Sequence, residues 1–508
     1  MKASSQKKKK KWCRIPCSHS KRGETEAKGT CFVKDCECSR VDIVSAVNQR
    51  GFDREGESRR ERESAWGMRQ TGDLSTSKAA GAIEFFFSNT QLPGWNKKGI
   101  DICNGNKTSL VSSGKGGETP MKPKRRYYSL IDKVYQMNNL DEAWLSVKKN
   151  QGSGGIDGVS IGMYEKNVST NLRELQRLLQ QGRYVPDPVR RHYIEKENGK
   201  LRPLGIPTIR DRVCQQAVRQ IIEPIFEEDF YYYSFGFRAG YSAHQAIRTI
   251  RRAKRNGYEH VVDLDIVSFF DEIPHEGLME KVQERISDGK VLTLIRGWLT
   301  SGVMEDDQFH ETEIGSPQGG VISPLLANIY LNAFDWGMKE QGFAVVRYAD
   351  DAVILCKTKE QAQEAYRAAK KILEEELRLR MHPEKTKVVD FDEGFRFLGF
   401  DFRRDYIALP DAKVKKYKDK IRKATCRQQG KNLDGMLGKL NEISRGFGNY
   451  FGIGNVKKKF ERLDQWTRMR VRAFMRKKRS TVSNRLIPNK VLESAGMVFL
   501  TSLLTTRS

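Results

Sequence analysis

The sequence of 508 residues has no long uninterrupted run of apolar residues. None approaches the roughly 20 consecutive apolar residues that a membrane-spanning helix requires. The lysine block at residues 7–11 is not followed by an apolar stretch, so we expect no secretory signal. The composition therefore does not favour membrane-spanning or secreted proteins.

Histidine and cysteine are scarce: the chain has seven histidines and nine cysteines. An odd number of cysteines in a long chain argues against a disulfide framework and fits a reducing compartment. Five of the cysteines crowd the first part of the chain: Cys13, Cys17, Cys31, Cys36 and Cys38. Their spacing matches no standard zinc pattern, and a zinc site there stays an open alternative.

Acidic residues are outnumbered, with 64 Asp and Glu against 91 Lys and Arg and a formal net charge of +27. An excess of positive charge is informative about partners more than about fold. Nucleic acid is the leading partner class, and an anionic membrane surface is the second.

Three regions differ in composition. Residues 1–120 are rich in Gly, Ser, Lys and Arg without sustained periodicity, so we expect them to be disordered or to be leader sequence that is not translated. Residues 121–405 mix helical and strand patterns, which predicts an α+β fold, and residues 406–508 are helical and basic. We predict a helix ending at Gly182 and a hairpin with its turn at Asn198-Gly199. Ser323 is expected to cap a helix that follows the glycine-rich loop 315–320.

The segment RYADDAVILC, residues 347–356, sets two adjacent aspartates between apolar, strand-like stretches. Neighbouring side chains on a regular strand point to opposite faces, whereas at a hairpin bend Asp350 and Asp351 could approach one site. A solvated turn is the alternative for an Asp-Asp pair. Buried like charges repel each other, so the hairpin reading requires a compensating positive charge.

A third carboxylate is available in the strand-like segment VVDLDIVSFFDEIPH, residues 261–275. Asp263 and Asp265 share one face of this strand. Together with the Asp350–Asp351 bend, Asp265 would complete a three-carboxylate pocket suited to two Mg²⁺ ions. Such a pair of ions supports phosphoryl transfer and supplies the compensating charge.

Basic side chains occur at two further places. Arg190, Lys196 and Arg202 lie on and around the predicted hairpin, where a solvated basic surface is the alternative to anion binding. A C-terminal helix carries cations of one sign along one face, which favours RNA contact over simple solvation. These cations are Lys457, Lys458, Lys459, Arg468, Arg472 and Arg476.

The ordered motifs resemble those of reverse transcriptases encoded by bacterial group II introns. They are GGIDGVS (154–160), GKLRPLGIPTIRDRVCQQAV (199–218), SFGFRAGYSAHQAI (234–247), DLDIVSFFDEIPH (263–275), GSPQGG (315–320), YADD (348–351), KTKVVDF (385–391) and FRFLGFDF (395–402). After them, LNEISRGFGNYFGIG (440–454) is similar to the family's maturase, or thumb, segment.

The resemblance implies a right-hand polymerase with fingers and palm in 121–405 and a helical thumb/maturase domain in 406–508. It implies that Asp265, Asp350, Asp351 and the backbone carbonyl of Ile266 hold two Mg²⁺ ions. It also implies triphosphate contacts from Lys196 and Arg202, with Arg190 nearby. Phe270 would select deoxynucleotides, Gln318 would lie near the nucleotide, and Tyr348 beside the primer end. Phe269 and Phe270 point oppositely on an extended backbone, so one of them is expected to be core.

We therefore expect an RNA-directed DNA polymerase with maturase activity that assists intron splicing and retrohoming. The expected partners are group II intron RNA, an RNA template, a DNA primer and dNTPs. We expect no membrane partner and a location in the bacterial cytoplasm. No histidine follows His382 and no cysteine follows Cys426, so we expect no His/Cys endonuclease in this sequence. Two alternatives stay open: a splicing factor with a vestigial polymerase site, and a domesticated relative in DNA repair or phage defence.

Overall fold

A computed structural model describes residues 125–195, 199, 201–426, 430, 432–476 and 486–504. All of the described residues belong to one compact unit. The expectations for residues 1–120, including the cysteine cluster, fall outside the described residues. Among the described helices, none combines the length and apolar character needed to cross a membrane.

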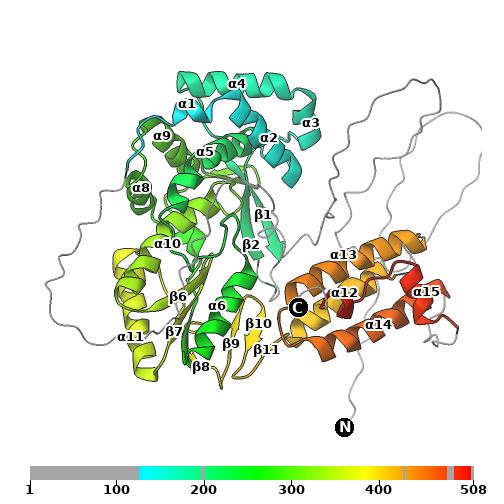
Figure 1. The fold of residues 1–508 in the computed structure, drawn as a ribbon. Coiled ribbons are helices and arrows are strands. Elements are labelled where there is room, and N and C mark those ends of the chain that lie inside the picture. The colour runs from blue at the N-terminus through cyan, green and yellow to red at the C-terminus, as the bar shows by residue number, and fades with distance from the viewer. Residues whose placement is uncertain are drawn as a thin grey trace, which may run out of the picture. The chain divides into compact units, whose positions relative to one another are not determined.

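The first described elements are helices, shown in cyan to green in Figure 1. They are α1 (Ile131–Val134), α2 (Met137–Asn150), α3 (Ile161–Lys166), α4 (Val168–Gln181) and, after a hairpin, α5 (Ile209–Glu227). Helix α4 buries Leu172, Leu175 and Leu179 at helical spacing. It ends at Gly182, which adopts a left-handed conformation with φ of 66° and confirms the predicted helix end.

A four-stranded sheet, which we call the hairpin sheet, has the strand order β2-β1-β4-β5. Its strands are β1 (Val189–Glu195), β2 (Leu201–Ile206), β4 (Val303–Glu305) and β5 (Gln308–His310). The antiparallel pairing of β1 with β2 runs from Arg190–Ile206 to Glu195–Leu201 and confirms the predicted hairpin. Gly199 has φ of 76°, as a tight connection requires, whereas Asn198 lies outside the described residues.

A second sheet, the carboxylate sheet, has the antiparallel order β6-β7-β3-β8. Its strands are β3 (His260–Leu264), β6 (Ala344–Tyr348), β7 (Asp351–Cys356) and β8 (Lys387–Asp390). Alternate residues face two different cores. Val262 and Ile354 pack with α10 (Ser323–Glu340) and α11 (Lys359–Lys370), whereas Val261 and Val353 pack with α6 (Ala243–Arg255). The sheet is thus held between helices on both faces (Figure 1).

Short elements connect these layers: α7 (Phe269–Glu272), α8 (His275–Gln283), α9 (Gly289–Thr300) and the π-helical turn η1 (Lys371–Glu376). A small antiparallel sheet follows the carboxylate sheet, with β9 (Phe395–Phe397), β10 (Phe400–Phe402) and β11 (Ile407–Ala408). Its aromatic residues join the α6 side of the core, and Phe395 stacks on Phe402 with ring centroids 4.9 Å apart.

The rest of the described chain is helical: α12 (Asp411–Ala424), α13 (Leu433–Phe451), α14 (Lys457–Met475), α15 (Asn489–Ser494) and the 3-10 turn η3 (Thr501–Leu503). Tyr417 and Ile421 of α12 are buried, as their helical spacing predicts. The Tyr450 hydroxyl of α13 donates a 2.9 Å hydrogen bond to the Leu398 carbonyl in the β9–β10 turn. A mixed helix–strand region followed by a helical one confirms the α+β class.

Candidate active site

The two adjacent aspartates lie at a hairpin bend. Strands β6 and β7 pair from Ala344–Leu355 to Tyr348–Asp351, which leaves Ala349 and Asp350 as the turn. Ala349 has φ of 61°, so its backbone adopts the left-handed conformation that a two-residue hairpin turn requires. The bend explains how Asp350 and Asp351 avoid the strict alternation of a strand, and it confirms the hairpin reading over a strand that continues through both aspartates.

Asp265 is brought next to this bend by sheet register. The antiparallel β3–β7 pairing ends where Leu264 lies opposite Ala352. Asp265 follows Leu264 on one strand and Asp351 precedes Ala352 on the other, so the two aspartates lie beside each other. The Asp265 backbone is anchored because its carbonyl accepts a 2.8 Å hydrogen bond from the His382 amide. Ile266 and Met381 form an isolated β-bridge. The two hydrogen bonds of this bridge involve the Val267 amide and the Asp265 carbonyl, so the Ile266 carbonyl takes no part in it.

Electrostatic crowding marks this group of carboxylates. Desolvation by the surrounding protein, together with the charges of Asp350, Asp265 and Asp263, raises the pKa of Asp351 from 3.8 to about 7. Desolvation also raises the pKa of Asp350, against the opposing charges of Arg202 and Arg347. The pKa of Asp263 rises to about 6 through desolvation and the charge of Asp265. The site therefore favours a bound cation when these groups are ionised.

One cation of the chain already contacts the site. Lys385 Nζ lies 2.6 Å from Asp265 Oδ2 and forms an ion pair with it. Because carboxylate oxygens are the ligands that Mg²⁺ prefers, the chemistry of the donor set fits a divalent cation. In the described ranges, no three His, Cys, Asp or Glu side chains already form a group that could hold a metal ion. Metal binding at Asp265 would thus compete with the Lys385 ammonium.

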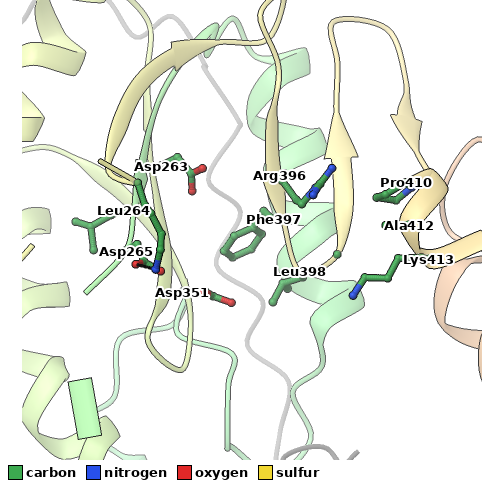
Figure 2. Close-up of a pocket in the computed structure, with 12 residues that line it drawn as sticks. Asp263, Leu264, Asp265, Asp351, Arg396, Phe397, Leu398, Pro410, Ala412 and Lys413 are labelled. Atoms are coloured by element: carbon green, nitrogen blue, oxygen red, sulfur yellow. Dashed lines mark hydrogen bonds and ion pairs between the residues drawn. The ribbon is translucent and has the colours of Figure 1, made fainter. Parts of the chain in front are cut away.

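The carboxylates open onto a pocket of about 390 Å³ (Figure 2). Asp263, Asp265 and Asp351 lie along one wall, and Arg396 and Lys413 lie on the other. The remaining lining residues are Leu264, Lys385, Phe397, Leu398, Gly399, Pro410 and Ala412. Asp350 is not among the lining residues. Arg396 and Lys413 were not expected at the site from their sequence positions, although Arg396 lies within the motif FRFLGFDF.

Two of the three predicted hairpin cations share one face of the hairpin sheet. Arg190 pairs with Ile206 and Ile194 with Arg202, and cross-strand partners project to the same side. The charge of Arg202 opposes the rise in the pKa of Asp350 that burial causes, so this guanidinium acts electrostatically on the carboxylate turn. Burial lowers the pKa of Arg212, and the like charge of Arg190 adds to this effect. Lys196 lies outside the described residues.

The glycine-rich loop 315–320 joins the hairpin sheet to the aromatic segment after β3. Its Gln318 carbonyl accepts a 2.7 Å hydrogen bond from the Gly205 amide of β2, and its Ser316 amide donates a 2.7 Å bond to the Phe270 carbonyl. The side chains of Phe270 and Gln318 are half-buried, whereas Phe269 is 3% exposed and belongs to the core. Tyr348 is half-buried and is the β6 residue opposite Asp351.

One local prediction about this loop is wrong. Ser323 is the first residue of α10 and Ile322 is its N-cap. The Ser323 hydroxyl donates a 3.0 Å hydrogen bond back to the Pro317 carbonyl, which secures the loop instead of the helix end. Pro324 occupies the first turn of this helix.

The predicted RNA-binding cations of α14 differ in exposure. Lys457, Lys458 and Arg476 are exposed. Lys459 forms a 2.7 Å ion pair with Asp411 and also donates to the Leu409 carbonyl, and Arg468 lies over the Phe499 ring.

Arg472 corrects the expectation of a uniform cationic face on α14. Its side chain is fully buried, and the residue is 2% exposed. Its guanidinium donates to the Ile487 carbonyl at 2.8 Å and to Asn489 Oδ1 at 2.5 Å. This side chain ties α14 to the following segment and has no free donor surface for a phosphate.

Comparison with known proteins agrees with this geometry. Residues 194–402 match the family model described as reverse transcriptase (RNA-dependent DNA polymerase), and residues 414–491 match the group II intron maturase-specific domain. Protein YkfC of Escherichia coli strain K12 is 37% identical over 317 residues, covering 54% of this chain and 83% of YkfC.

The group II intron-encoded protein LtrA of Lactococcus lactis subsp. cremoris is 32% identical over 344 residues, covering 54% of this chain. The match spans 57% of LtrA, so this chain corresponds to little more than half of that relative. Among solved structures, a partial Cas6-RT-Cas1–Cas2 complex matches with a TM-score of 0.33 and 28% identity, covering 52% of this chain and 45% of that one.

The two family models follow each other in the order that the sequence motifs predict, polymerase first and maturase domain second. Together with the relatives, they support RNA-directed DNA polymerase and maturase function and confirm the reverse transcriptase fold. The chain belongs to the family of group II intron reverse transcriptases and maturases.

Proposed function

We propose that this chain copies RNA into DNA at the carboxylates Asp265, Asp350 and Asp351. The observation that carries the proposal is the β3–β7 register, which sets Asp265 beside Asp351 although they are far apart in sequence. A primer 3′-hydroxyl would attack the α-phosphorus of a dNTP, and pyrophosphate would leave. Burial, together with the charges of the neighbouring carboxylates, raises the pKa of Asp351, and a bound cation would offset both effects.

The cofactor that suits this donor set is Mg²⁺, with two ions held by Asp265, Asp350, Asp351 and the Ile266 carbonyl. When bound, the ions would activate the attacking hydroxyl and stabilise the leaving oxygen. The chain itself orients the ligands: the His382 amide fixes the Asp265 backbone, and the β6–β7 turn fixes Asp350 and Asp351. The Lys385 ammonium forms an ion pair with Asp265 Oδ2, so a metal ion at this carboxylate would have to compete with it.

The nucleotide would be held between the hairpin sheet and the loop 315–320. Arg202 and Arg190 share one hairpin face, and Arg202 already acts on Asp350, which supports a role in binding the triphosphate. Lys196 is proposed for the same role from its sequence position. The Phe270 and Gln318 carbonyls take part in the hydrogen bonds that hold the loop 315–320 in place. We propose that the Phe270 side chain selects deoxynucleotides over ribonucleotides. Tyr348, opposite Asp351, is the candidate for contact with the primer end.

The maturase activity would rest on binding of group II intron RNA by the helical region, with retrohoming as the process that both activities serve. Lys457, Lys458 and Arg476 remain as exposed cations of α14 for phosphate contact, with Lys459 and Arg468 partly engaged within the protein. Phosphate contacts of this kind make binding strongly salt dependent.

Primer extension on an RNA template tests the polymerase site. Asp265→Asn is expected to reduce extension by more than about 100-fold. Loss of a direct metal ligand should cost more activity than loss of a residue that only hydrogen-bonds to a ligand, which typically costs about 10–100-fold. Asp263→Asn, two residues earlier on the same face and in the same pocket, is the matched control and should retain extension. Equal loss in both variants would contradict the assignment of Asp265 as the ligand.

The same assay separates the polymerase from a splicing factor with a vestigial site. If the chain is such a splicing factor, the wild-type protein should be as inactive in primer extension as Asp265→Asn, and both proteins should still promote splicing of the intron RNA. Extension by wild type alone supports the reverse transcriptase.

A further inference from the structure

A fully buried ion pair lies directly behind the carboxylate turn. Arg347, the β6 residue before Tyr348, is 1% exposed, and Asp335 of α10 is 0% exposed. Arg347 Nε lies 2.8 Å from Asp335 Oδ1 and Nη2 lies 2.6 Å from Oδ2, which is a two-pronged contact. The pair joins the strand that leads into the turn to the helix packed beneath the sheet.

The third nitrogen of Arg347 reaches the turn itself. Nη1 donates a 2.8 Å hydrogen bond to the carbonyl of Ala349, the first residue of the turn, and a 3.0 Å hydrogen bond to Asn328 Oδ1 of α10. Asn328 Nδ2 then donates 2.8 Å to the Gly236 carbonyl. A Cβ at Gly236 would collide with the Ala349 amide nitrogen, so this glycine lies directly against the turn. The turn is thus fixed by both hydrogen bonds and close backbone packing.

These contacts hold Ala349 in a backbone conformation that an alanine rarely adopts. A residue with a Cβ rarely adopts the left-handed backbone seen at φ of 61°, so surrounding contacts must hold it. The Arg347 backbone is held as well, because its amide donates to the Tyr233 carbonyl at 3.0 Å and its carbonyl accepts from the Phe235 amide at 2.8 Å. A buried ion pair is weak evidence for stability, since well-packed apolar residues often serve as well. Its geometric effect on the turn is the better explanation.

We propose that Arg347, with Asp335 and Asn328, is a positioning residue that sets the geometry of Asp350 and Asp351 through the Ala349 carbonyl. The inference rests on the proposed polymerase function, which it deepens. A lysine cannot replace the guanidinium, because one ammonium group cannot hold a two-pronged carboxylate contact and the Ala349 and Asn328 oxygens at once.

Arg347→Lys in the full chain is the test, and Arg285→Lys is the matched control. Arg285 is 4% exposed, contacts the carboxylates of Glu228 and Asp229, and donates a 3.0 Å hydrogen bond to the Arg125 carbonyl, and none of these contacts reaches the turn. Three measurements are made on each variant: the melting temperature, kcat and KM for single-nucleotide incorporation, and hydrogen exchange of peptides covering residues 345–356.

Arg347→Lys is expected to lower kcat on the order of 100-fold, as a displacement of about 1 Å at a reacting centre does, with KM for dNTP and affinity for template–primer unchanged. Amides of the turn should exchange faster, while Arg285→Lys keeps both kcat and turn exchange at wild-type values. Equal kcat losses in the two variants at equal melting temperatures would overturn the proposal, as would wild-type turn exchange in Arg347→Lys.

A milder variant covers the case in which Arg347→Lys fails to fold. Asn328→Ala keeps the ion pair and removes only the amide that bridges Arg347 to Gly236. It should accelerate turn exchange and lower kcat less than Arg347→Lys, and unchanged turn exchange would overturn the proposal. If wild type synthesises no DNA, the proposed function fails, whereas the exchange measurement still decides whether Arg347 orders the turn.

Discussion

Removing the carboxylate charge of Asp351 should stabilise the metal-free protein at alkaline pH, although the proposed role of Asp351 as a metal ligand predicts that the same change abolishes DNA synthesis. The pKa of Asp351 is raised in the folded protein from 3.8 to about 7. The folded state therefore binds more protons than the unfolded state between these values, and stability falls as the pH rises through this window. Asp351→Asn has no carboxylate to ionise and escapes that loss.

The size of the effect follows from the shift. About three pKa units correspond to roughly 4 kcal/mol at most. Asp351 is exposed at the pocket, where solvent screens its interactions, so we expect about 1–2 kcal/mol. For a chain of this size, that gain corresponds to an increase of about 1–3 °C in Tm.

The assay is a pair of thermal melts in EDTA, at pH 5 and pH 8, for wild type and Asp351→Asn. At pH 5, not far above the unfolded-state pKa of 3.8, only part of this loss is present, so the two proteins should melt closer together than at pH 8. At pH 8 the variant should melt higher, and Mg²⁺ should raise the Tm of wild type only. Asp405→Asn, on the exposed β10–β11 turn, is the control. An equal gain at both pH values, or none at pH 8, would refute the reasoning.

Three further outcomes are expected. Arg202→Ala should raise KM for dNTP about 10-fold in primer extension, which is the cost of one charge-assisted contact, whereas Arg191→Ala on the opposite hairpin face should not. Lys458→Ala should reduce the salt slope of RNA binding by about one, whereas the buried Arg472→Ala should lower Tm and leave the slope unchanged in filter-binding titrations. Gly236→Ala should abolish extension while RNA affinity is kept, because the added methyl displaces the turn, and full extension activity would contradict the packing described.

Local patterns were sufficient to predict the hairpins and most helix faces. The β6–β7 bend follows from two apolar strands around an Asp-Asp pair, and the end of α4 follows from Gly182. The proximity of Asp265 to Asp351 was expected from the pattern of carboxylates and from the family resemblance, but the sequence alone does not specify which strands pair. The register that sets them side by side forms only in the folded sheet.

Contacts between distant elements could not be predicted from spacing. Arg347 looked like part of an apolar strand, and its partner Asp335 lies on a different element whose packing beneath the sheet depends on the whole fold. Arg472 has the same helical spacing as its exposed neighbours, but the segment 487–489 packs over it and buries its guanidinium. Arg396 reaches the pocket because β9 follows the carboxylate sheet in space as well as in sequence.

The ion pair between Lys385 and Asp265 gives the protein a built-in competitor for metal ions. An ammonium tethered to the same chain competes as an intramolecular group, so it would raise the cation concentration needed for half occupancy of Asp265. The phosphates of a bound nucleic acid or nucleotide are suited to attract the Lys385 ammonium in turn. If Asp265 is the proposed metal ligand, a bound polyanionic substrate would therefore favour cation binding at this carboxylate.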